Sequence, residues 1–176
     1  MIELALNTIK KFLELWEVPK ASDIANNPLV WDKAQAHFVT IYHAWEIVGS
    51  SGSLIPAKDN MALELILNTL TAMKDERFKK LWKQNFAKIN IRIDTDFKRK
   101  QIKPKEAKIE DLNPVKTWII AVRPDYTEMA IILPNISTQI AQGSDYLDAL
   151  SIKLWKEFKR EEFWVYALET TQLTNF

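Results

Sequence analysis

The hydrophobic pattern in the first half of the chain has the period of an α-helix. Apolar residues recur there at spacings of three and four, which places them on one face of a helix. Asn27 followed by Pro28 is a strong start signal, and Gly49 suits a helix end. The pattern therefore predicts three to four helices within residues 1–87, namely 2–16, 28–48 and 60–73, with a further turn or restarted helix around 78–86.

The period changes to two in the second half of the chain. Ile89, Ile91 and Ile93 alternate with polar residues, which is typical of a strand with one buried face. Two apolar runs rich in β-branched residues predict a hairpin that is covered on both faces. An amphipathic segment then predicts a last helix, and an aromatic run after it predicts a strand. These elements lie at 88–95, 115–134, 145–161 and 163–169.

Two connections stand out between these elements. Residues 49–60 contain two of the three glycines and predict a mobile connection, and residues 97–112 predict an exposed basic loop. The expected fold is α+β and predominantly helical, in one compact unit. A helical half (1–87) would pack with a small, mostly antiparallel sheet and one long helix (88–176).

The composition removes several classes of function. The chain has no cysteine, which excludes disulfides, thiolate nucleophiles and Cys-ligated metals. It has no glycine-rich nucleotide motif, so no cofactor is expected. The longest uncharged stretch, residues 129–142, is too short to span a bilayer, and the first residues lack the order of a signal peptide. We therefore expect a cytoplasmic protein without membrane association.

The net charge of +1 hides a strong local asymmetry. Residues 74–108 hold thirteen Lys and Arg against five Asp and Glu, an excess of +8, and acidic segments flank them. Such a concentration of cations can neutralise phosphates. A hydrated lysine-rich loop and a docking surface for an acidic protein are the alternatives. The candidate nucleic-acid-binding residues are Lys79, Lys80, Lys83, Lys98, Arg99, Lys100, Lys103, Lys105 and Lys108.

The aromatic and histidine residues give weaker signals. Most of the seven tryptophans fall on predicted apolar faces, so we expect them in the core; any exposed ones would mark a partner surface. His37 and His43 stand six residues apart on one predicted helix, which places them too far around its axis to share a metal.

Four acidic residues offer an alternative chemistry. Asp94 and Asp96 end a predicted strand, and with Asp125 and Glu128 they could hold magnesium beside the basic loop, as in a phosphodiester-cleaving enzyme. The order of elements resembles the restriction-endonuclease core, and Pro124-Asp125 is similar to its Pro-Asp element. The acid-x-Lys triplet of that family is absent, since the sequence reads Glu128-Met129-Ala130. Aspartates at turns are more often turn formers.

Together, these patterns favour a non-enzymatic binding protein or subunit of a larger assembly. It would contact the phosphate backbone of RNA or single-stranded DNA through the basic segment, while a helical face packs on a protein partner or on a second copy. The alternatives are a protein-interaction module without nucleic acid and a metal-dependent nuclease. The sequence assigns no catalytic residue.

Overall fold

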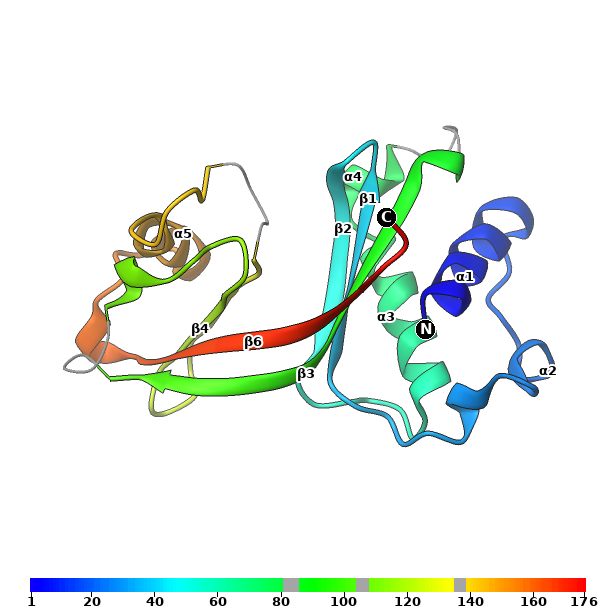
Figure 1. Ribbon diagram of the computed structural model, residues 1–176, viewed down its shortest axis with the longest axis horizontal. Helices are drawn as coiled ribbons and strands as arrows, with labels where there is room; N and C mark the ends of the chain where they lie inside the picture. The colour runs from blue at the N-terminus through cyan, green and yellow to red at the C-terminus, as the bar shows by residue number, and fades with distance from the viewer. Residues whose placement is uncertain (81–85, 104–107, 135–138) are drawn as a thin grey trace. The chain divides into compact units, whose positions relative to one another are not determined.

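The protein is described from a computed structural model that covers residues 1–80, 86–103, 108–134 and 139–176 (Figure 1). The chain forms two compact units. Unit 1 comprises Met1–Asp96 and Thr171–Phe176, and unit 2 comprises Phe97–Thr170. The strand order is β2-β1-β3-β6-β4-β5, and β3 and β6 each contribute to both units.

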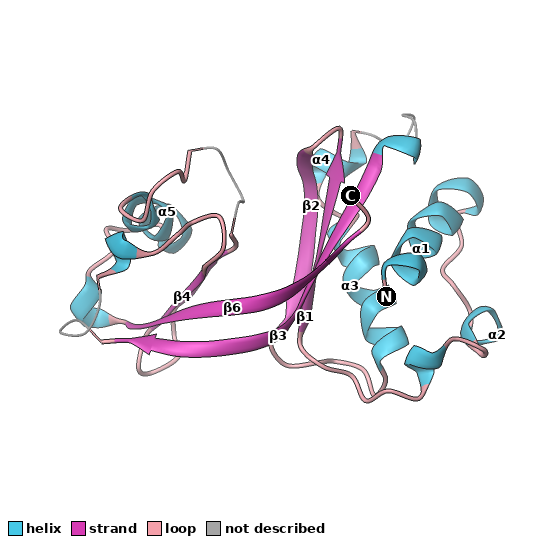
Figure 2. Cartoon of the chain, in the orientation of Figure 1, coloured by secondary structure: helices cyan, strands magenta, loops and turns pink. Residues whose placement is uncertain are grey.

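Helices and strands occur in both units (Figure 2). The α-helices are α1 (Ile2–Leu15), α2 (Ala21–Ile24), α3 (Met61–Ala72), α4 (Glu76–Lys79) and α5 (Asp145–Leu154). The strands are β1 (His37–His43), β2 (Glu46–Ser53), β3 (Ile89–Ile102), β4 (Trp118–Val122), β5 (Met129–Ile132) and β6 (Trp164–Thr174). The fold is a mixed α+β fold with an antiparallel sheet, so the prediction of a predominantly helical chain is wrong.

The error lies in the segment that was expected to form the second helix. Residues 28–48 instead contain a short 3-10 turn and then the first strand of the β1–β2 hairpin. The run from His37 to His43 is buried nearly throughout, and a strand that is covered on both faces shows no alternation to distinguish it from a helix. The turn places Ala44 and Trp45 at positive φ, a position where Asn-Gly is the usual signal.

Unit 1 builds its core between the helices and one face of β1, β2 and β3. α1 packs on α3, and α3 packs on β1 and β2 (Figure 1). Asn60 caps α3 by accepting a hydrogen bond from the backbone N–H of Leu63, as expected for an N-cap. The buried side chains of this core include Ile9, Val39, Ile41, Leu65, Phe78, Ile91 and Ile93.

Unit 2 builds a second core between α5 and one face of β4, β5 and β6. Its buried side chains include Ile119, Ala121, Ile132, Tyr146, Leu150 and Val165. The predicted strand at 163–169 is confirmed and extends to Thr174, whereas α5 is shorter than expected and ends at Leu154. β3 continues to Ile102, so the first six residues of the predicted loop at 97–112 belong to a strand.

Candidate nucleic-acid interface

The structure divides the nine predicted phosphate-binding residues between the two units. Lys79 and Lys80 lie at the end of α4 in unit 1, where the ammonium of Lys79 is 2.5 Å from Oε1 of Glu76. Lys83 and Lys105 lie outside the described residues. The rest belong to unit 2, where they are all exposed: Lys98, Arg99, Lys100, Lys103 and Lys108.

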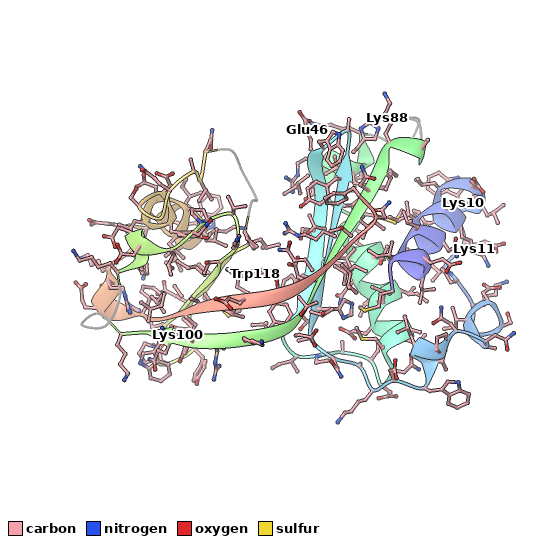
Figure 3. The ribbon with its side chains drawn as sticks, in the orientation of Figure 1. Lys10, Lys11, Glu46, Lys88, Lys100 and Trp118 are labelled. Carbon is pink, nitrogen blue, oxygen red and sulfur yellow. The ribbon has the colours of Figure 1, made fainter. Side chains whose placement is uncertain are left out.

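The concentrated positive charge of unit 2 lies on the second half of β3. Lys98, Arg99 and Lys100 are consecutive and exposed, and Figure 3 labels Lys100 on this segment. Among the described residues, the structure pairs none of the three with a carboxylate. Their charge is therefore available to an external anion.

The cations at the β4–β5 turn are used differently. Arg123 contacts Oε2 of both Glu128 and Glu162, at 3.3 and 2.5 Å, and Lys156 contacts Glu128 Oε2 at 2.6 Å. This network neutralises charge within the protein. Arg123 and Lys156 are thus paired with carboxylates, whereas the cations at 98–100 on β3 are not paired with a described carboxylate.

The sheet of unit 2 presents an aromatic face on the side opposite to α5. The register pairs Ile120 with Tyr166 and Val122 with Trp164, and directly opposed residues of neighbouring strands point to the same face. The residues that alternate with them, such as Ile119 and Val165, lie in the core against α5. We define the aromatic face as Phe97, Arg99, Trp118, Ile120, Val122, Trp164 and Tyr166, with Tyr126 at its rim.

Ring contacts connect the basic segment to this face. The guanidinium carbon of Arg99 lies 4.9 Å from the ring centroid of Tyr166, within the range of a cation–π interaction. Phe97 packs edge-on against the buried Trp118 at 5.4 Å. At the other end, Tyr126 contacts Trp164 at 6.2 Å, and their side chains are 75% and 39% exposed. Arg99 therefore shares this face with accessible rings, whereas Lys98 and Lys100, which alternate with it along β3, point to the side of Ile102 and the α5 core.

The tryptophans are not the core residues that the sequence suggested. Of the six described ones, only Trp118 is buried, and the other five are exposed: Trp16, Trp31, Trp45, Trp155 and Trp164. Trp82 lies outside the described residues. Trp16, Trp45 and Trp155 occupy positions of positive φ at helix ends or turns, which helical periodicity cannot reveal. Exposed tryptophans are common anchors of binding surfaces.

The four candidate metal ligands are distributed over both units. Asp94 is buried and its Oδ2 lies 3.0 Å from Nε of Arg92, while Asp96 is exposed. Asp125 accepts hydrogen bonds from the N–H and the hydroxyl of Thr127, which lower the pKa of its carboxyl group. In the described part of the chain, no three His, Asp or Glu side chains gather as metal ligands would.

The two histidines lie on β1 rather than on a helix.

The aromatic partners of the basic segment, Tyr166, Trp164 and Tyr126, were not among the predicted site residues. The alternation of aromatics in residues 163–169 was the signal that could have indicated them, because alternate residues of a strand share a face.

The fold and this surface define a two-unit α+β protein with a sheet face on which Arg99, Trp164 and Tyr126 are exposed around the buried Trp118, Ile120 and Val122. Its sequence matches the AMMECR1 family over residues 2–173, so the chain belongs to the AMMECR1 family. It is 24% identical to Protein CA_C1420 of Clostridium acetobutylicum over 169 residues, which is 93% of this chain but 34% of that protein. The chain thus spans about a third of the length of this curated relative.

A solved structure shares the fold. The uncharacterized protein PH0010 of Pyrococcus horikoshii superposes with a TM-score of 0.70 at 14% sequence identity, covering 98% of this chain and 88% of that one. Within the described residues, the helices are all too short or too polar to cross a membrane.

Proposed function

We propose that this protein is a non-enzymatic binding protein, or a subunit of a larger assembly, that holds single-stranded nucleic acid on unit 2. The observation that carries the proposal is the position of Arg99 over Tyr166, within a run of three exposed cations that no described carboxylate neutralises. Proteins that bind single strands combine cations along the backbone with aromatic rings on which bases stack. We expect the protein to act in the cytoplasm.

Each part of the surface has a role in this proposal. Arg99 contacts phosphates on the aromatic face, Lys98 and Lys100 contact them from the other side of β3, and Lys103 and Lys108 add charge beyond the end of the strand. Trp164 and Tyr126 offer exposed rings for bases. Because such contacts read neither base edges nor sequence, we expect RNA and single-stranded DNA to bind with little sequence preference.

The test is fluorescence anisotropy with labelled single strands of about twelve nucleotides, a length within the range that one such surface covers. The triple variant Lys98→Ala, Arg99→Ala, Lys100→Ala should bind at least about tenfold more weakly, with a shallower dependence of affinity on salt. Trp164→Ala should weaken binding by about 1–3 kcal/mol through lost stacking. A control variant with Lys10, Lys74 and Lys116 changed to Ala removes the same charge from exposed positions elsewhere.

Two results would refute the proposal. One is the absence of binding at about 50 mM salt, where phosphate contacts are strongest. The other is an equal loss of affinity in the triple variant and in the control, because binding would then depend on net charge and not on this surface.

The exposed tryptophans of unit 1 favour a second function, that of a protein-interaction module. Trp31 is 84% exposed and Trp16 is 63% exposed, the latter beside the exposed Leu15 and Val18. Apolar groups of this size on a surface favour association with another protein. Recovery of a partner that persists after nuclease treatment and is lost in Trp16→Ala or Trp31→Ala would support this function.

A further inference from the structure

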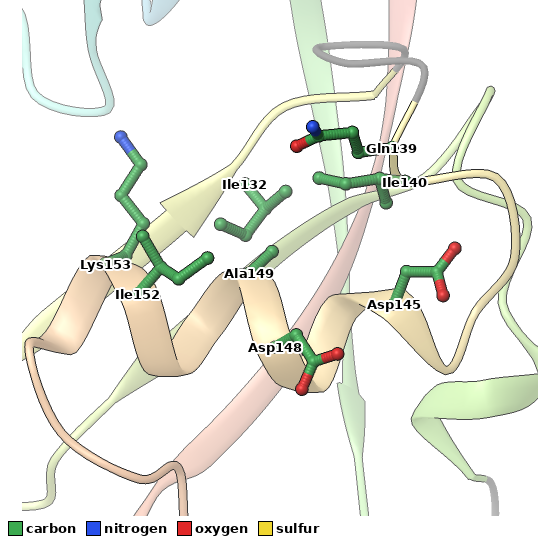
Figure 4. Close-up of a pocket in the computed structure, with 8 residues that line it drawn as sticks. All are labelled: Ile132, Gln139, Ile140, Asp145, Asp148, Ala149, Ile152 and Lys153. Carbon is green, nitrogen blue, oxygen red and sulfur yellow. The ribbon is translucent and has the colours of Figure 1, made fainter.

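A hollow of about 320 Å³ lies beside α5 in unit 2 (Figure 4). α5 forms one wall, and β5 together with residues 139–140 forms the other. The interior is lined by Ile132, Ile140, Ala149 and Ile152. Its volume is at the lower end of the range for small-molecule sites, which are mostly apolar with a few polar groups at their edges.

The sequence of α5 explains the shape of this hollow. Asp145, Ala149, Ile152 and Lys153 follow one another at spacings of four, three and one, so they lie along one side of the helix. Ala149 stands in the middle of this row, and its small side chain leaves the space that the hollow occupies. Ile152 is 74% exposed and therefore offers apolar surface at the edge.

The two ends of the hollow carry opposite charges. Asp145 and Asp148 lie toward the beginning of α5, and Lys153 lies toward its end (Figure 4). Oδ2 of Asp145 accepts hydrogen bonds from the backbone N–H groups of Gln142 and Ala141, at 3.0 and 2.9 Å. These bonds lower the pKa of its carboxyl group, which is therefore ionised at neutral pH.

Two further carboxylates, Glu110 and Asp111, belong to a 3-10 turn that contacts α5. Gly143 allows this approach, because a Cβ at that position would lie 2.2 Å from the backbone oxygen of Glu110. Both carboxylates are exposed, and so is Lys108 at the start of the same turn, so the turn adds a net charge of about −1 near the beginning of α5.

We propose that this hollow binds an aliphatic zwitterion, with an ammonium group beside Asp145 and Asp148 and a carboxylate beside Lys153. At 1.5 Å per residue, Lys153 is separated along the helix axis by roughly 7.5 Å from Asp148 and by roughly 12 Å from Asp145. A chain of about five carbons extends over a length similar to the shorter separation. The methylene groups of the ligand would lie over Ala149 between Ile132 and Ile152. Both ω-amino acids and the C-terminal lysine of a peptide have this chemistry.

The test is a titration of the full chain, followed by the methyl NMR signals of its isoleucines. ε-Aminocaproate should shift the signals of Ile132, Ile140 and Ile152 saturably. It should bind about fivefold more tightly than hexylamine or caproate, each of which lacks one charged end; an exposed ion pair of about 1 kcal/mol gives this factor. A peptide ending in lysine then distinguishes the two sources by whether it binds more tightly or more weakly than ε-aminocaproate. Its amidated form lacks the free carboxylate that Lys153 would contact and should bind more weakly than the free peptide.

Variants test each end separately. Asp148→Asn should weaken ε-aminocaproate and hexylamine alike, whereas Lys153→Met should weaken ε-aminocaproate and leave hexylamine unchanged. Ala149→Leu should abolish binding of all three probes by filling the hollow. Glu157→Gln and Lys159→Met are controls that change one exposed charge outside it. Equal affinity for the three probes, no saturable shift, or full binding by Ala149→Leu would each overturn the proposal.

Discussion

The side-chain amide nitrogen of Asn68 lies 3.1 Å from Nε2 of His37, and both side chains are buried between α3 and β1. Nδ1 of His37 lies 3.0 Å from the backbone oxygen of Gln35. A carbonyl oxygen can only accept, so Nδ1 carries the proton and Nε2 accepts from Asn68. This arrangement holds the imidazole neutral.

The neutral state of the buried His37 predicts how the free energy of unfolding depends on pH. Burial lowers the pKa of His37 below its ordinary value of 6.5, so the unfolded state binds the proton more readily than the folded state. The stabilisation that results from this difference in proton binding is fully present above pH 6.5. It decreases as the pH falls from 6.5 toward the pKa of His37 in the folded state. Urea unfolding at a series of pH values from 8 to 5 should therefore show stability falling below about 6.5.

Two variants isolate the contribution of His37 to that slope. His37→Gln should flatten the decrease, since a neutral amide does not titrate. His43→Gln removes the other histidine of the chain and should leave the decrease in place. An unchanged slope in His37→Gln would show that other groups cause it.

The β1–β2 hairpin shows where sequence patterns were insufficient. The spacing of Trp31, Phe38, Ile41, Trp45 and Val48 matched a helix, but the strand pairing with β3 and the cover by α3 decided the structure. Both depend on contacts far apart in the sequence. By contrast, the strand at Ile89, Ile91 and Ile93 was predicted correctly because its alternation is local.

The sequence indicated the cations of the candidate interface but not its aromatic residues, because the aromatic residues depend on contacts far apart in the sequence. Charge density along the chain indicated Lys98, Arg99 and Lys100 directly. Tyr166 and Trp164 join them only through the order of strands, which places β3 beside β6 and β6 beside β4. Strand order is a property of the whole topology and leaves no local mark in the sequence.

Gly49 provides a prediction about packing. We expected it to end a helix, but it lies in β2, where a Cβ would approach the backbone oxygen of Ala72 in α3 to 2.2 Å. Backbone cannot move aside as a side chain can, so Gly49→Ala should destabilise the protein by about 1–3 kcal/mol, measured by urea unfolding. Ser51→Ala on the same strand should change stability by less than about 0.5 kcal/mol. A Gly49→Ala variant as stable as wild type would contradict this close approach.

Arg92 and Asp94 provide a prediction about buried charge. They stand two apart on β3 with side chains 5% and 0% exposed, and Nε lies 3.0 Å from Oδ2. Removing the carboxylate leaves a buried cation without this partner, so Asp94→Ala should cost about 3–5 kcal/mol of unfolding free energy. Glu76→Ala breaks the exposed pair with Lys79 and should cost less than about 1 kcal/mol. Equal costs in the two variants would mean that burial does not distinguish the pairs.

Trp155 provides a prediction in which a substitution increases stability. It follows α5 in the left-handed region, with φ of 56°, and its side chain is 94% exposed. A non-glycine residue in this conformation costs roughly 1–2 kcal/mol, while glycine adopts it freely but loses more backbone entropy on folding. Because the exposed ring contributes little packing, Trp155→Gly should raise the unfolding free energy by about 0.5–1 kcal/mol net. Trp155→Ala retains the strained φ and should show no such gain. Thermal and urea unfolding of the three proteins measure this difference, and a destabilised Trp155→Gly would show that the ring stabilises the folded chain.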